Sequence, residues 1–183
     1  MAADIQNVYL QAPASEKHYI ICGNEFGIDN AGKVVLTRRA LYGGKSSSAD
    51  FLKHLRTCME HLHFNPCKGD SEVWMREALD YDGTPYWEYV LLYVDDVLCV
   101  SAKCESVIRN ELVKYFQIKE SSIGPPDIYL GNKISKVTLE NGNQAWSFSL
   151  SQYVQAAVRN VEKYLKEQNK CWSNKAMYLF KGD

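Results

Sequence analysis

The chain has 183 residues, of which 46% are hydrophobic, 12% aromatic and 23% charged. These are ordinary globular values, so they exclude a wholly disordered chain. No apolar stretch approaches the roughly 20 residues of a membrane span, and the first residues lack the features of a secretory signal. We therefore expect an intracellular protein without membrane contact. A net charge of −1 gives no overall basic surplus for phosphate contacts. Tight nucleic-acid binding would therefore need a local basic patch or further parts of the protein.

The six cysteines are scattered, with no CxxC pair, which favours free thiols. Four possible zinc ligands, Cys58, His61, His63 and Cys67, lie close together. Their spacing matches no standard zinc finger. An ordinary helix end with a surface histidine pair is the favoured interpretation.

The N-terminal half predicts a short hairpin followed by a helix. Residues 18–22 and 34–36 are β-rich and flank a segment that contains glycine and asparagine. Gly43 and Gly44 then interrupt the chain before a helical pattern. The predicted buried face of this helix consists of Phe51, Leu52, Leu55, Met59 and Leu62.

The strongest pattern lies between Trp87 and Val100. Two β-rich apolar runs are separated there by Asp95 and Asp96, which indicates a tight hairpin. The runs are nearly continuous rather than alternating. We therefore expect this hairpin to be buried on both faces or to lie centrally in a sheet.

The remaining pattern predicts a helix, a second hairpin and a last helix. Cys104–Phe116 should be helical, with Val107, Ile108, Leu112, Val113 and Phe116 inward. A Gly-Pro-Pro break at residues 124–126 precedes strands at 133–139 and 144–150. Ser151 should cap a helix to about Lys166, with Tyr153, Val154, Ala157, Val161 and Leu165 on one face. This order predicts an α+β fold, with one domain over residues 1–168 and a divergent tail over residues 169–183.

The paired carboxylates need an explanation, because ionised groups near a core are costly unless they are paired or bind a metal. A solvent-facing turn is the alternative, since Asp is a common turn residue. The dipeptide alone favours the solvent-facing turn, whereas the full string Tyr93–Asp96 inside a long hydrophobic hairpin favours a functional site.

The wider sequence resembles the copia-type reverse transcriptases. Tyr93–Asp96 (YVDD) is similar to their catalytic hairpin, Asp4–Leu10 (DIQNVYL) to their first catalytic motif, and Ala40–Gly43 (ALYG) with Lys45 to the next block. Further blocks occur in family order at residues 64–67, 129–134 and 150–154. The resemblance covers about residues 4–166. It implies a palm with a central antiparallel sheet and flanking helices, and the activity of an RNA-directed DNA polymerase.

The resemblance also implies a two-metal site that uses Mg²⁺ or Mn²⁺. Asp4 and Asp95 would bridge both ions, Asp96 would be a looser third acid, and the Ile5 carbonyl would be an extra ligand. These are the expected catalytic and metal-binding residues.

The expected nucleotide contacts are Tyr9, Lys45 and Ser46, and Tyr93 would lie near the primer end. Tyr9 stands where the family has an aromatic steric gate against ribonucleotides, although it could be an ordinary core tyrosine. Lys45 could equally be a solvated loop lysine, and Tyr93 could simply fill the sheet. The expected partners are an RNA or DNA template with primer, deoxynucleoside triphosphates, and the integrase and ribonuclease H of the same polyprotein.

Three departures from the family pattern stand out. Ser46 replaces the usual Gln, only three residues precede Asp4, and the sequence diverges from about Lys170. From the second departure we expect a clipped first strand and a palm without the fingers. We expect a cytoplasmic location, in a virus-like particle of an intact element, or a nuclear one. The alternative function is a non-catalytic retroelement remnant that keeps the palm fold and weak nucleic-acid or metal binding.

Overall fold

A computed structural model describes residues 1–170 of the chain. Contacts divide the described residues into two compact units, Met1–Pro125 and a second unit that begins at Pro126. The division falls at the Gly-Pro-Pro break, where two successive prolines prevent regular hydrogen bonding. The sequence predicted one domain over residues 1–168. That the two units form one functional domain stays a prediction. The tail prediction lies outside the described residues, except for residues 169 and 170.

The first unit is built on a five-stranded antiparallel sheet in the order β1-β7-β6-β5-β4. Its strands are β1 (Ala2–Asp4), β4 (Asn65–Pro66), β5 (Val73–Leu79), β6 (Pro85–Tyr93) and β7 (Asp96–Val100). The predicted hairpin is β6–β7, and both strands lie inside the sheet. The strand β6 lies centrally, as expected, but it is not fully buried on both faces, because buried side chains alternate with half-buried ones along Glu88–Leu92.

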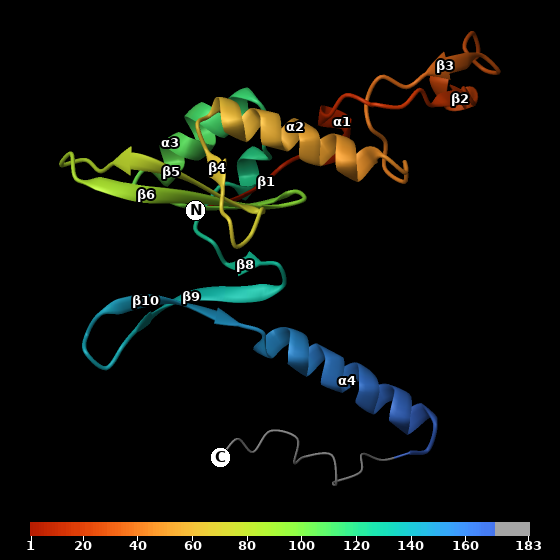
Figure 1. Cartoon of the computed structure of the whole chain (residues 1–183). Helices are drawn as coiled ribbons and strands as arrows, with labels where there is room; N and C mark the ends of the chain where they lie inside the picture. Colours follow the sequence, from red (N-terminus) through yellow and green to blue (C-terminus); the bar gives the residue numbers. More distant parts are fainter. Residues whose placement is uncertain (171–183) are drawn as a thin grey trace. The chain divides into compact units, whose positions relative to one another are not determined.

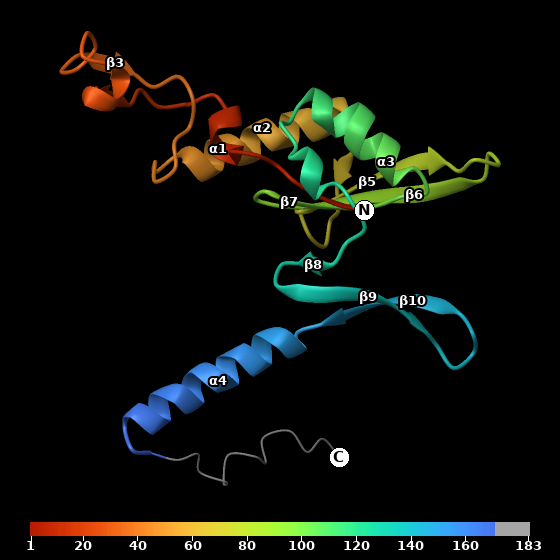
Figure 2. The same cartoon turned by 180° about the vertical axis from the view of Figure 1, so that it is seen from behind.

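Helices cover one face of this sheet (Figure 1), and Figure 2 shows the same layering from behind. They are α2 (Ser47–His61) and a second helical segment of α3 (Cys104–Ser106), η2 (Val107–Glu111) and η3 (Leu112–Lys114). The core lies between these helices and the inner face of the sheet. Its members include Phe51, Leu55, Met59, Val90, Leu92, Val97, Ile108, Leu112 and Phe116.

In these two helical segments, two of the side chains predicted to face inward are exposed. Leu52 is 57% exposed and Val113 is 46% exposed. The predicted regular helix over Cys104–Phe116 also changes pitch, because residues 107–111 form a wider π turn and residues 112–114 a tighter one. The buried face consists of Val107, Ile108, Leu112 and Phe116, and Val113 lies off it.

A short helix α1 (Val8–Gln11) follows β1 and was not predicted. Beyond it, β2 (Tyr19–Ile21) and β3 (Val34–Leu36) form the predicted two-stranded hairpin, with the short turn η1 (Asn24–Phe26) between them. This hairpin stands away from the five-stranded sheet (Figure 1). The turn η4 (Glu120–Ser122) closes the unit beside β1.

The second unit contains a three-stranded antiparallel sheet and one helix. The strands β8 (Ile128–Tyr129), β9 (Asn132–Thr138) and β10 (Gln144–Ser149) precede α4 (Ser151–Glu167). The hairpin β9–β10 agrees with the prediction. Ser151 is the first helical residue rather than the cap, and its N–H donates to Ser149 Oγ at 3.3 Å. Four of the five predicted inward residues are exposed and Leu165 is half-buried, so the β8–β10 sheet does not bury this face; the exposed residues are Tyr153, Val154, Ala157 and Val161.

The described part of the chain therefore mixes α and β structure with antiparallel sheets. No helix in residues 1–170 has the length and apolar character needed to cross a membrane. The five cysteines that the structure describes are free, and Cys171 lies outside the described residues.

Candidate active site

Two of the predicted acids face each other across neighbouring strands. Asp4, the last residue of β1, is the register partner of Asp96, the first residue of β7. Asp96 is also the partner of Tyr93 at the end of β6. Directly opposed residues of an antiparallel pair have their side chains on the same face. Asp4, Asp96 and Tyr93 therefore form a row across three strands.

This row lies on the face of the sheet opposite the helices. The neighbouring positions Ala3, Val97 and Leu92 are buried in the core on the helix-covered face, so alternation directs the row outward. Asp4 and Tyr93 are exposed and Asp96 is half-buried. The carboxylates are thus accessible from outside this unit.

Main-chain hydrogen bonds hold β1 in this position. The Ile5 N–H donates to the Asp95 carbonyl at 2.8 Å, and the Lys119 N–H donates to the Asp4 carbonyl at 2.9 Å. The Asp4 N–H donates to Ser122 Oγ at 2.8 Å. Ile5 itself is buried in the core, which anchors the end of the strand. The backbone of Asp4 is therefore held on both sides, by β7 and by the segment around η4.

The turn between β6 and β7 is strained. Val94 has φ 53°, in the left-handed region. A β-branched residue is an outlier there, and such conformations cost about 1–3 kcal/mol each. Strain of this kind persists where the surrounding structure imposes it, and it is common at functional sites. Here the β6–β7 pairing imposes it and places Asp95 at the tip.

The three carboxylates influence one another. The pKa of Asp96 is raised, first by burial and then by the negative charges of Asp95 and Asp4. The ionised form of Asp96 is therefore disfavoured at this site. Three carboxylates are oxygen donors of the kind that Mg²⁺ and Mn²⁺ prefer, so their chemistry fits a divalent cation. However, no three His, Cys, Asp or Glu side chains in residues 1–170 converge closely enough to hold an ion.

Tyr9 lies in a cluster of aromatic residues. Its ring makes edge-on contacts with Tyr42 at 4.9 Å and Phe51 at 6.2 Å between centroids. Its hydroxyl group is 3.4 Å from Ser48 Oγ at the start of α2. The structure thus brings Tyr9 against the segment that contains the ALYG block. Its half-buried ring is compatible with either a steric gate or a packing role.

Lys45 and Ser46 lie just before α2. Lys45 is exposed, and Ser46 occupies the N-cap position, where its carbonyl accepts the Asp50 N–H at 2.9 Å. The side chain of Ser46 makes no cap hydrogen bond to the helix. Nucleotide contacts by Lys45, Ser46 and Tyr9, and a primer contact by Tyr93, stay predictions.

Sequence reasoning missed Ser122 and Lys119, whose contacts fix the backbone of Asp4. No motif around these residues signals this role, because it depends on a tertiary contact between η4 and β1.

Two of the four possible zinc ligands, Cys58 and His61, have surroundings that bear on metal binding. Burial raises the pKa of Cys58 to about 11, and His61 stacks on Tyr115. A thiol that resists ionisation is a poor zinc ligand.

A comparison with protein families identifies the class of protein. The model of the family described as "Reverse transcriptase (RNA-dependent DNA polymerase)" matches residues 1–179. The chain therefore belongs to the reverse transcriptase family. The match extends into the segment 169–183. Searches of curated proteins and of solved structures gave no significant match.

Proposed function

We propose that this chain is the palm region of a copia-type retrotransposon reverse transcriptase, with the activity of an RNA-directed DNA polymerase. The observation that carries the proposal is the register pairing of Asp4 with Asp96, beside Asp95, on the face of the sheet opposite the helices. In a chain of the reverse transcriptase family, this is an arrangement suited to nucleotidyl transfer.

In this proposal Asp4 and Asp95 hold the catalytic cations, Asp96 is a looser third acid, and the Ile5 carbonyl is an additional ligand. Two Mg²⁺ or Mn²⁺ ions would activate the primer 3′-hydroxyl and neutralise the departing pyrophosphate. Because the carboxylates do not converge in the described residues, binding would require their side chains to rotate. The paired backbones of β1 and β7 would keep them within reach.

Substrate contacts complete the proposal. Tyr9 would exclude a ribose 2′-hydroxyl, Lys45 and Ser46 would contact the incoming nucleotide, and Tyr93 would support the primer end. The partners would be a template with primer, deoxynucleoside triphosphates, and the integrase and ribonuclease H of a polyprotein. The location would be a cytoplasmic virus-like particle or the nucleus.

A second candidate is a non-catalytic remnant with the palm fold and weak nucleic-acid or metal binding. The lack of a convergent metal-binding group in residues 1–170 favours it. Both candidates share the fold, so only activity separates them.

Primer extension on an RNA template with Mn²⁺ tests the proposal. Extension by this chain should be very slow, because Ser46 is short where the family has Gln and the net charge of −1 gives a weak hold on template and primer. Asp95→Asn should abolish it, whereas Asp29→Asn, a control on the β2–β3 hairpin, should not. Extension that survives Asp95→Asn contradicts the assignment, and no extension at high enzyme concentration favours the remnant.

A further inference from the structure

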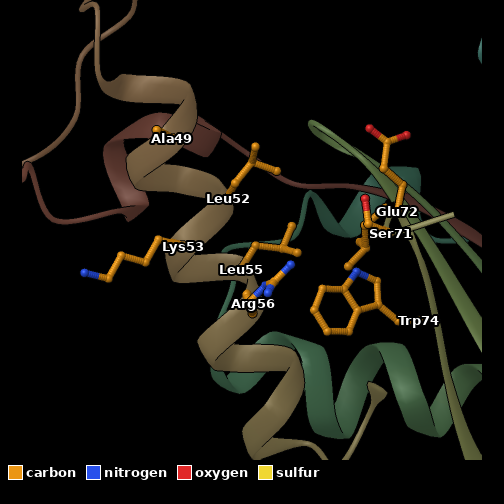
Figure 3. A pocket seen from close by; sticks show the side chains of 9 residues that line it. Ala49, Leu52, Lys53, Leu55, Arg56, Ser71, Glu72 and Trp74 are labelled. Carbon is orange, nitrogen blue, oxygen red and sulfur yellow. The ribbon is translucent and has the colours of Figure 1, made fainter. Parts of the chain in front are cut away.

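A cavity of about 460 Å³ lies between α2 and the sheet, in the first unit (Figure 3). Its walls are largely apolar and include Leu52 and Leu55 from α2, Trp74 from β5 and Leu92 from β6. This volume falls within the range of small-molecule pockets. Leu92 and Trp74 belong to the inner face of the sheet, whereas Asp4 and Asp96 lie on the face opposite the helices. The cavity is therefore separate from the candidate active site.

One wall of the cavity has an unsatisfied hydrogen-bond donor. Trp74 is only 2% exposed, and its Nε1 is buried without a hydrogen-bond partner in residues 1–170. Buried indole N–H groups usually have a partner, because an unpaired buried donor is costly. A ligand acceptor that reached Nε1 from the cavity would satisfy this donor.

A positive charge faces the same space. Arg56 extends from α2 towards the indole ring of Trp74 (Figure 3). Within the described residues, Arg56 has neither an ion pair nor a side-chain hydrogen bond. Lys53 extends away from the ring, and the carboxylate of Glu72 also points away from it (Figure 3). The polar groups beside the indole ring are therefore the Arg56 guanidinium group, the indole N–H and the Ser71 hydroxyl group, and the first two can only donate.

We propose that this cavity binds a small organic anion with an apolar, ring-sized body. The body packs against Leu52, Leu55 and Leu92, and an oxygen of its carboxylate accepts from Trp74 Nε1 and from the Arg56 guanidinium group. Charge-assisted hydrogen bonds of this kind are stronger than neutral ones, and guanidinium matches the geometry of a carboxylate. The nearby negative charge of Glu72 favours a singly charged ligand over a multiply charged one.

The indole N–H signals of the ¹⁵N-labelled full chain provide the test. The chain has four tryptophans, and Trp74→Phe identifies the signal of Trp74. Titration with 2-naphthoate should move this signal downfield and reach saturation. The cation 2-naphthylmethylamine, which has the same ring system, should bind at least about fivefold more weakly, because it would face Arg56.

Two variants and one control test the residues. Arg56→Gln should weaken 2-naphthoate binding by about fivefold or more, whereas Arg38→Gln, at an exposed arginine before the ALYG block, should leave it unchanged. Leu52→Trp should fill the cavity and abolish the shift, and if that variant fails to fold, Arg56→Gln decides alone. A Trp74 signal that does not respond to millimolar 2-naphthoate overturns the proposal. Equal binding of the amine, or an unchanged affinity in Arg56→Gln, also overturns it.

Discussion

Asp4 and Asp96 are direct register partners across β1 and β7, although 91 residues separate them in the sequence. Two carboxylates at opposed positions of an antiparallel pair repel each other. The raised pKa of Asp96, caused first by burial and then by Asp95 and Asp4, is the electrostatic consequence. The first two predictions rest on this repulsion.

The first prediction concerns pH. Because folding raises the pKa of Asp96, the folded state binds this proton more tightly than the unfolded state. The stabilisation is complete below the unfolded pKa and is lost as the pH rises through the higher folded pKa. Asp96→Asn should therefore be more stable than the wild type at pH 7, by up to about 1 kcal/mol for this partly solvated group. Urea unfolding in EDTA between pH 4 and 7 measures this, with Asp29→Asn as the matched control. A less stable Asp96→Asn variant at pH 7 would contradict the prediction.

The second prediction concerns metal ions. A cation that binds the folded state stabilises it by mass action, by about 1.4 kcal/mol at ten times the dissociation constant. Mn²⁺ or Mg²⁺ should therefore raise the Tm by roughly 3–6 °C, and Asp95→Asn should remove the rise. Differential scanning fluorimetry with increasing Mn²⁺ measures both proteins. An identical response would show that Asp95 is not a ligand.

The third prediction concerns a buried ion pair between β5 and β6, on the face of the sheet that the helices cover. Glu88 is 3% exposed and accepts from Arg76 Nε at 2.5 Å, while Arg76 also makes two hydrogen bonds to Glu111 at 2.7 and 3.0 Å. Arg76→Met would leave the Glu88 carboxylate without its cation, so it should cost about 3–5 kcal/mol of unfolding free energy.

The double variant Arg76→Met with Glu88→Gln should recover part of this loss, since no buried charge is then left unpaired at Glu88. Urea unfolding of both single variants and the double variant gives the coupling free energy. Additive effects of the two substitutions would mean that the pair does not act as a unit.

The fourth prediction concerns thiol reactivity. A hydrogen bond from Cys99 lowers the pKa of Cys104 and raises that of Cys99, while burial raises the pKa of Cys58 to about 11. The thiolate is the reactive form, so iodoacetamide at pH 7 should modify Cys104 well before Cys58 and Cys99. Peptide mass spectrometry over time measures the order. Cys99→Ser should alter the rate at Cys104, and faster labelling of Cys58 than of Cys104 would contradict the assignment.

Short-range patterns in the sequence predicted much of the fold. The hairpins β6–β7 and β9–β10 were predicted from apolar runs and turn residues, because strands joined by a tight turn pair with their chain neighbour. The inward positions Phe51, Leu55 and Met59 of α2 also follow from helical periodicity alone. The YVDD string and the other blocks predicted the reverse transcriptase family, which the family match confirms.

The tertiary structure decided the features that depend on distant parts of the chain. The Asp4–Asp96 register comes from pairing between β1 and β7. The hydrogen bond from the Asp4 N–H to Ser122 Oγ joins residues 118 positions apart. No local pattern can therefore show either contact. Leu52 lines the cavity beside α2 and stays exposed, although its helical position predicted burial. Periodicity indicates which side of a helix is apolar. Only packing against particular neighbours determines which of those apolar side chains are buried from solvent.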